Sequence, residues 1–486
     1  MAIYTGKFRI SVTVFLLFFL LSGMTVAGPA DERRSTLEEQ LAVAVTIYNE
    51  DLALVKDVRK VQLDKGMNRL AMREVSARIR PETALLRSLS HPGAFTMLEQ
   101  NFDFDLLTPA KLLEKYLGRT VHIVKTHPTT GRESMVKAQV LSTNSGVVLK
   151  VGNRIETGVP GRLVFDSVPA NLRDRPTLVM QLQNKKSTHQ ELELSYLTGG
   201  LAWQADYVAE LNGDDSRVDL NGWVTLTNQS GTTYPNARLQ LVAGDVNRVR
   251  EDMHLIEKRA GFAAEAMDAA APMSQQALFE YHLYTLARPT TIADNQTKQV
   301  ALLSAADVPV RKELVLAGND YYYSSSVGEL GQKMKIGVYV EFENKANAHL
   351  GMPLPKGVVR VYKKDQDGNA QFVGEDRIEH TPKNEKVRLR LGNAFDVTAD
   401  KKQMGFKKRA SSKKYHYAFE SAYEIVLKNA KPQAVTVSVQ EPVPGDWKML
   451  EESHRHTKAA ANTASWRVKV PAEGSATLRY RVLVRY

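Results

Sequence analysis

The chain has 486 residues, too many for one ordinary domain, and this length predicts about two to four domains. A hydrophobic share of 43% and a charged share of 24% are typical of a globular protein and exclude a disordered or fibrous one. There are no cysteines, which excludes disulfides, thiolate nucleophiles, Cys-ligated zinc and iron–sulfur clusters. The formal charge of +11 is a mild excess spread along the chain. It suits solubility and is compatible with anionic partners such as phospholipid headgroups, lipopolysaccharide or acidic polysaccharide.

Residues 1–27 have the layout of a secretory signal peptide. Lys7 and Arg9 form the basic region, residues 10–21 form an apolar run, and residues 25–27 are small enough for a cleavage site. Because this run is shorter than the roughly 18–20 residues that span a membrane, we expect cleavage rather than a retained anchor. Cleavage removes Lys7 and Arg9 and leaves a charge of +9, with no transmembrane segment in the mature chain. The sequence therefore predicts a periplasmic or secreted protein.

Residues 28–105 are predicted to form an N-terminal β unit, because short apolar runs alternate with turn-forming residues. A helix follows at residues 108–117, with Thr108 as its cap, Pro109 at its first position and Gly118 after its end. This helix opens the second predicted domain, residues 106–167. The rest of that domain consists of short strands separated by glycines, which indicates a small barrel-like unit.

Residues 168–250 are predicted to form a first β-sandwich region, in which Gly199 and Gly200 interrupt a run of alternating strands. Residues 251–277 are Ala-rich and poor in β-branched side chains, which predicts a flexible linker or long loop. Strict apolar–polar alternation resumes in residues 278–486, the predicted C-terminal β-sandwich region. The fold class expected is mainly β, with several antiparallel immunoglobulin-like sandwiches, a barrel-like unit, one short helix and an Ala-rich insertion.

A strand that ends in asparagine and is followed by a polar turn occurs four times, at Asn184, Asn228, Asn344 and Asn429. Asparagine tolerates left-handed backbone and forms hydrogen bonds within its own turn. The intervals between the four are unequal, which excludes a solenoid of fixed period. We interpret them as the same hairpin used in two or more sandwiches.

Several phrases of the sequence resemble one known family. They are SYLTGGLAWQADYVAEL, GWVTLTNQSG, ARLQLVAGDVN, LPKGVVRVYKKD, LRLGNAFDV, YEIVLKNAKPQAVTVSVQEPVPGDW and LRYRVLVRY. Together they resemble the bacterial family catalogued as domain of unknown function 4139, sometimes labelled mucoidy-inhibitor-A-like, from about Val45 to the last residue. The resemblance implies an exported or surface-associated β-rich protein of undetermined activity, and the label points to exopolysaccharide or envelope control. Many members carry a coiled coil in the N-terminal half, but this chain has no sustained heptads there. The family supplies no catalytic residues.

The sequence contains no G-x-S-x-G elbow, H-E-x-x-H, P-loop or G-x-G-x-x-G, so the familiar hydrolases, zincins and nucleotide binders lose support. His454 and His456 lie two residues apart without a visible third ligand, and a surface loop is favoured over a metal site. Residues 365–369 resemble a calcium loop but lack its ligand spacing, so we interpret them as a hairpin turn. No cofactor or metal site is predicted.

The basic stretch KKQMGFKKRASSKK, residues 401–414, is the one local charge feature that stands out. It is a candidate patch for phosphate-bearing lipid or acidic glycan, against the alternative of a solvated loop. Its basic residues are Lys401, Lys402, Lys407, Lys408, Arg409, Lys413 and Lys414. A second candidate is an aromatic platform for sugars, although strand alternation favours core positions for most of its members. These are Trp203, Tyr207, Trp223 and Tyr234.

Taken together, the sequence favours an exported, non-enzymatic scaffold or binding protein of the cell envelope. The partners expected are envelope proteins, anionic lipid or acidic polysaccharide, and nucleic acid is not expected. The alternative is an exported hydrolase that acts on glycan or peptide, with a site assembled from distant loops. A deep pocket with close carboxylates or a Ser–His pair favours the enzyme, and a flat aromatic or basic surface favours the binder.

Overall fold

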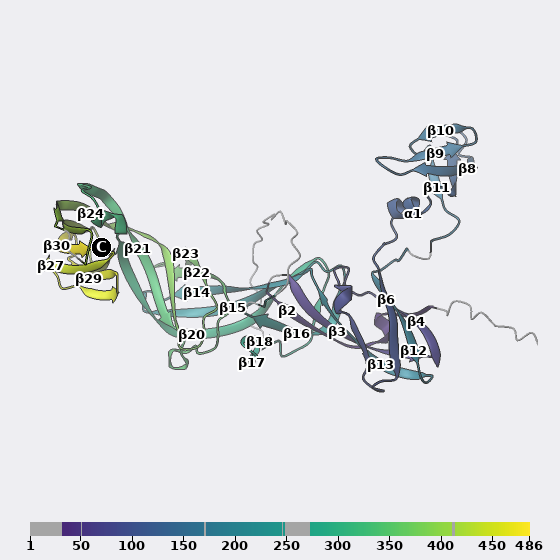
Figure 1. Ribbon diagram of the computed structural model, residues 1–486, viewed down its shortest axis with the longest axis horizontal. Helices are drawn as coiled ribbons and strands as arrows, with labels where there is room; N and C mark the ends of the chain where they lie inside the picture. Colours follow the sequence, from purple (N-terminus) through teal and green to yellow (C-terminus); the bar gives the residue numbers. More distant parts are fainter. Residues whose placement is uncertain (1–31, 50, 170–171, 245, 248–272, 411–413) are drawn as a thin grey trace, which may run out of the picture.

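The computed structural model describes residues 32–49, 51–169, 172–244, 246–247, 273–410 and 414–486. The predicted signal peptide and most of the Ala-rich segment lie outside these residues. Of the described residues, 65% are in strands and 5% in helices, so the fold is mainly β, as the sequence predicts. The molecule is elongated, with the N-terminal strands and the C-terminal strands at opposite ends and a small separate unit to one side (Figure 1).

Two sheets at the N-terminal end pack face to face around a shared core. The first has the order β1 (Glu32–Ser35), β4 (Gly66–Arg73), β12 (Thr177–Asn184) and β6 (Phe95–Asp103). The second has the order β17 (Ser274–Leu278), β18 (Tyr281–Thr285), β16 (Tyr234–Ala243), β2 (Gln40–Tyr48), β3 (Leu52–Leu63), β13 (Thr188–Thr198) and β5 (Leu85–Ser88), and β19 (Thr290–Ile292) also pairs with β16. Strands from the first 103 residues therefore share both sheets with strands from residues 177–292.

The small unit is an insertion between β6 and β12, which are themselves paired neighbours. It contains α1 (Pro109–Lys115) and one open sheet with its own core around Val121, Ile123 and Leu149. The sheet order is β10 (Arg154–Thr157), β9 (Val148–Val151), β8 (Glu133–Ser142), β7 (Thr120–Thr126) and β11 (Arg162–Val164). Because β10 and β11 are both free edges, this sheet is not closed into a barrel, unlike the barrel-like unit expected from the sequence.

Helix α1 forms as its sequence predicts. The Thr108 hydroxyl accepts a hydrogen bond from the backbone N–H of Lys111 at 3.2 Å, Pro109 occupies the first turn, and Gly118 beyond its end has φ +76°. The other helical turns are single 3-10 turns. They are η1 (Leu37–Glu39), η2 (Pro81–Thr83), η3 (Asp320–Tyr323) and η4 (Ala346–Ala348).

The remaining strands form one long sheet that joins the two ends of the molecule. Its main path is β23 (Ala370–Ile378), β22 (Gly357–Lys364), β14 (Leu201–Leu211), β15 (Arg217–Asn228), β20 (Gln296–Ala317), β21 (Glu329–Glu343), β24 (Lys386–Arg409), β25 (Ala418–Asn429), β30 (Gly474–Arg485) and β27 (Asp446–Glu452). Off this path, β20 also pairs with β26 (Val435–Pro442), which pairs with β29 (Thr463–Val470), and β29 pairs with β28 (Thr457–Ala460).

Long strands carry the chain from one core to the other. Residues 296–309 of β20 pair with β15 beside the core that the two N-terminal sheets share. The last residues of β20 pair with β21 and β26 at a second core, the C-terminal core. The C-terminal core lies between the sheet path from β21 to β27 and the strands β26 and β29, and it contains Trp466, Tyr480 and Ile425.

The four recurrent asparagines are buried, and each one connects two loops. In every case the side-chain Nδ2 donates one hydrogen bond to a carbonyl in the turn that follows and another to a carbonyl of a separate loop. The pairs of acceptors are Lys186 and Asp64 for Asn184, Thr232 and Ala293 for Asn228, Met352 and Pro382 for Asn344, and Gln433 and Pro471 for Asn429. None of the four has a positive φ, so their role is hydrogen bonding between loops and not left-handed backbone.

Candidate functional site

The structure separates the seven residues of the predicted basic patch. Lys401 is 1% exposed and lies in the C-terminal core, so it does not belong to a surface patch. Lys402 is exposed on β24 and lies 3.8 Å from a carboxylate oxygen of Glu329. Arg409 donates from its Nε to Glu420 Oε2 on the neighbouring strand β25 at 2.7 Å. Lys413 lies outside the described residues.

The three other lysines of the stretch are at the surface. Lys407 and Lys408 are exposed at the end of β24 and, as successive strand residues, point to opposite faces of the sheet. The Lys408 ammonium lies 5.8 Å from the ring centre of Tyr417, and the Lys414 ammonium lies 4.9 Å from that of Tyr415. The basic stretch is therefore not one continuous patch, but part of it lies beside exposed aromatic rings.

Four aromatic side chains form a row at this end of the sheet, and we call Phe406, Tyr417, Phe419 and Tyr486 the aromatic row. Phe419 lies at its centre. Its ring is stacked on Phe406 at 5.5 Å and on Tyr417 at 6.3 Å, and it meets Tyr486 edge-on at 6.1 Å. Tyr417 is 55% exposed and Tyr486 is 39% exposed, so the row is accessible to solvent.

Strand register explains how aromatic rings come to be accessible at this end of the sheet. Lys408 is opposite Phe419, and Phe419 is opposite Val484, so these residues share one face of the sheet. The same face carries Ser421, two residues after Phe419 on β25, and Tyr480, four residues before Val484 on β30. Both of these side chains are buried. The aromatic row thus continues a core-facing surface to the end of the strands, where it becomes accessible.

The opposite face of the same strands is an ion-pair network. Arg409 and Arg481 both contact Glu420, and the Arg479 Nε donates to Glu424 at 2.7 Å. Hydrogen bonding to Arg409 lowers the pKa of Glu420. Because positive and negative charges compensate each other on that face, Lys408 on the aromatic face is the better placed cation for an anionic ligand.

The aromatic platform considered from the sequence is mostly core, as strand alternation favoured. Trp203, Tyr207 and Tyr234 are buried, and Trp223 is half-buried. Sequence reasoning missed the aromatic row, although Tyr417 and Phe419 are separated by the two-residue spacing of one strand face and directly follow the basic stretch.

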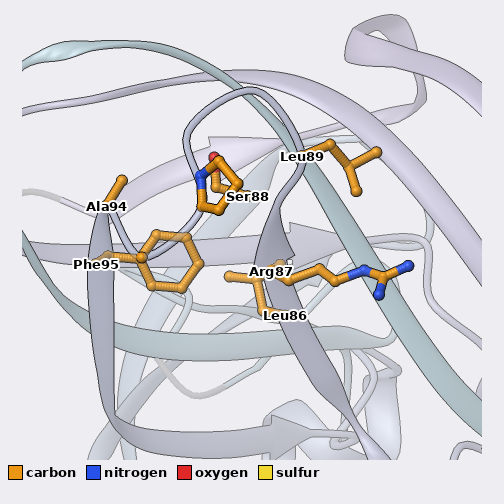
Figure 2. A pocket seen from close by; sticks show the side chains of 8 residues that line it. Leu86, Arg87, Ser88, Leu89, Ala94 and Phe95 are labelled. Carbon is orange, nitrogen blue, oxygen red and sulfur yellow. The ribbon is translucent and has the colours of Figure 1, made fainter.

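Open grooves on the surface include the following two. The first, of about 530 Å³, lies where β5 is followed by β6 and is lined by apolar side chains including Leu86, Leu89 and Phe95, with Arg87 at its rim (Figure 2). The second, of about 470 Å³, is lined by Arg311, Glu341, Glu343 and Lys386 among others. Both are wide and shallow, unlike the enclosed pockets that hold small-molecule ligands.

His454 and His456 contact different neighbours. The Glu452 carboxylate lies 2.9 Å from His456 Nδ1 and accepts a hydrogen bond from Trp466 Nε1 at 3.0 Å, while His454 contacts the neighbouring Ser453 hydroxyl. Among the described residues, no three His, Asp or Glu side chains are grouped as metal ligands. Residues 365–369 form the predicted hairpin turn between β22 and β23, with Gly368 at φ +85°.

A family model described as Domain of unknown function (DUF4139) matches residues 192–486, more than half of the chain. The chain belongs to this family. The matched DUF4139 region includes the aromatic row and the whole C-terminal core, whereas the small unit and most of the N-terminal strands precede it. No curated protein matches the chain. In the described residues, none of the helices has the length and apolar character needed to cross a membrane.

Proposed function

We propose that this DUF4139 protein is an exported, non-enzymatic protein of the cell envelope that binds an acidic polysaccharide through the aromatic row and Lys408. The observation that carries the proposal is the half-buried Phe419 ring, stacked on Phe406 and on the exposed Tyr417, with an ammonium group beside Tyr417. The sheets around the two larger cores serve as immunoglobulin-like sandwiches that hold this surface at one end of an elongated scaffold. Export rests on the secretory layout of residues 1–27.

The chemistry of the row suits a sugar ring. A pyranose has an apolar C–H face that packs on an aromatic ring, and stacked rings in a strand surface form a rigid apolar platform. An acidic sugar adds a carboxylate or sulfate, which a neighbouring lysine attracts at a surface where the charge is not already compensated. Tyr417 supplies the exposed ring and Lys408 the cation in this arrangement.

The hydrolase alternative depends on a carboxylate pair in a groove, and Glu341 and Glu343 line the second groove. Glu341 contacts Arg311 and Lys386, and hydrogen bonding to Lys345 lowers the pKa of Glu343. A carboxyl group with a lowered pKa is ionised at neutral pH and is poorly suited to act as a general acid. The groove therefore gives the hydrolase weaker support than the aromatic row gives the binder.

The test is titration of the purified chain with polygalacturonate, with neutral dextran and with phosphatidylglycerol vesicles. We expect binding to polygalacturonate that weakens about tenfold in Tyr417→Ala and in Lys408→Gln, equivalent to about 1.4 kcal/mol for each. Phe395→Ala is the matched control, because Phe395 lies on the same strand β24, is 94% exposed and is not part of the row. Binding to vesicles with none to polygalacturonate would show a headgroup ligand and refute the polysaccharide proposal.

A further inference from the structure

A lysine and a glutamate face each other inside the C-terminal core, where no solvent reaches them. The Nζ of Lys401 lies 2.7 Å from Oε1 and 2.6 Å from Oε2 of Glu441. The side chains are 1% and 0% exposed. The two residues are 40 positions apart in the chain, so only the fold brings them together.

Their surroundings are aromatic. The Lys401 ammonium lies 4.2 Å from the ring centre of Tyr322 and 5.2 Å from that of Tyr423. The Tyr323 hydroxyl donates a hydrogen bond to Glu441 Oε2 at 3.0 Å, and the Tyr480 hydroxyl lies 2.9 Å from that of Tyr323. The carboxyl group is thus held by one amine and one phenol in an apolar environment.

Gly318 shows how closely the carboxyl group is held. A Cβ at this position would lie 2.2 Å from Glu441 Oε2, so any other residue would force the carboxyl group to shift. The lack of a side chain at Gly318 therefore makes room for the Glu441 carboxyl group, which reaches the Lys401 amine across the core.

The pair connects strands that are not neighbours. Lys401 lies on β24, which pairs with β21 and β25, and Glu441 lies on β26, which pairs with β20 and β29. Contact between the two side chains therefore crosses the C-terminal core from one layer of strands to the other. A covalent bond at this point would fasten the two layers together.

Burial also changes the chemistry of the two groups. Desolvation lowers the pKa of Lys401, and a buried ammonium–carboxylate pair is relieved of its charge when the proton moves from nitrogen to oxygen. The products of that transfer are a neutral amine, which is a nucleophile, and a carboxylic acid in direct contact with it. The amine would attack Cδ of Glu441. The Tyr323 hydroxyl donates a hydrogen bond to an oxygen bound to this carbon, where negative charge develops during the attack.

We propose that Lys401 and Glu441 form an intramolecular isopeptide bond. A bond forms between Lys401 Nζ and Glu441 Cδ, and a Cδ–O bond of the carboxyl group breaks. The leaving oxygen departs as water, with one hydrogen from the carboxylic acid and one from the amine, so no oxidant or other co-reactant is needed. The proposal stands apart from polysaccharide binding. In a chain without cysteine, it supplies a covalent link that disulfides cannot.

The experiment compares purified wild-type chain with Lys401→Arg by intact mass spectrometry under denaturing conditions. Arginine keeps the positive charge but is not a nucleophile in this setting. We expect the wild-type mass to be lower than its composition requires by one water molecule, and the Lys401→Arg mass to equal its composition. Lys428→Arg, at an exposed position on β25, is the matched control and should retain the wild-type loss of water.

Tryptic digestion of the wild-type chain provides a second readout that does not depend on the folding of any variant. We expect a branched peptide that joins the segments around Lys401 and Glu441, with no cleavage after Lys401. Full mass in the wild-type chain, together with ordinary cleavage after Lys401, would establish a plain buried ion pair and overturn the proposal.

Discussion

Replacing Asn228 by alanine tests whether the buried asparagines hold the turns of this fold together. The Asn228 Nδ2 donates to the carbonyls of Thr232 at 2.9 Å, Ala293 at 3.1 Å and Ile292 at 3.2 Å. Its Oδ1 accepts from the backbone N–H of Ser230 at 3.0 Å and from the Ser230 hydroxyl at 2.7 Å. Alanine removes all of these hydrogen bonds from a buried site at once.

The expected cost follows from the groups left without a partner. A buried polar group that loses its hydrogen bond costs about 1–3 kcal/mol, and at least the Ile292 carbonyl and the Ser230 N–H lose theirs. We therefore expect Asn228→Ala to destabilise this region by about 3 kcal/mol, which is about a hundredfold in the opening equilibrium.

Native-state hydrogen exchange with peptide resolution measures this effect locally, which matters because the described residues form three separate cores. Peptides from β15 and β19 should exchange about a hundredfold faster in Asn228→Ala, while peptides from the C-terminal core stay unchanged. Asn228→Asp, which keeps the acceptor but cannot donate, should be at least as damaging because its oxygens face carbonyls.

Asn221→Ala is the matched control, since Asn221 is exposed on the same strand and accepts one hydrogen bond from the Ser304 hydroxyl. It should change stability by less than about 0.5 kcal/mol. Equal exchange rates in Asn228→Ala and Asn221→Ala would refute the view that the buried Asn228 amide joins the turn at Thr232 to the loop at Ala293.

Two further changes test the backbone and the ionic contacts. Gly200 has φ +81° and a Cβ there would lie 2.7 Å from a main-chain atom, so Gly200→Ala should cost about 2–4 kcal/mol by denaturant unfolding. Gly213→Ala, at a position with open space around it, should change stability by no more than about 1 kcal/mol, and equal effects would contradict the steric argument. Hydrogen bonding to Arg173 lowers the pKa of Glu32 to about 2, so the pair stabilises the folded chain above the ordinary carboxyl pKa of 4.5 and loses this effect as pH falls toward 2. Glu32→Gln should therefore lower the thermal midpoint at neutral pH but not near pH 2, and a difference that persists in acid would contradict the linkage.

Local features of the fold follow directly from the sequence. Thr108 and Pro109 start the helix where their chemistry places it, and residues 365–369 make the expected turn. The alternation of apolar residues in β21 and β25 likewise identifies the strands and their buried faces. These features depend on neighbours within a few positions, which is the range that periodicity and capping describe.

Pairing between distant strands has no such local signal. The parallel pairs β2–β16 and β14–β22 join segments far apart in the chain, and they combine residues that the sequence divides into separate units. The same reason explains Lys401, which looks like part of a charged surface until the fold brings Glu441 to it. The aromatic row likewise combines Phe406 of β24, Phe419 of β25, and Tyr417 and Tyr486, which lie just before β25 and just after β30. Of these four residues, only Tyr417 and Phe419 are close in sequence.

The aromatic row and the Lys401–Glu441 pair lie on one sheet, yet their tests are independent. Backbone pairing fixes the register of β24 against β25 through residues on both sides of Lys401, so Lys401→Arg leaves Phe406 and Phe419 in place. Tyr417→Ala removes an exposed ring outside the C-terminal core and leaves the amine and the carboxyl group in contact. A chain that carries the isopeptide bond but fails to bind polygalacturonate would therefore refute the proposed ligand alone. A chain that binds polygalacturonate but shows no loss of water in its mass would refute the isopeptide bond alone.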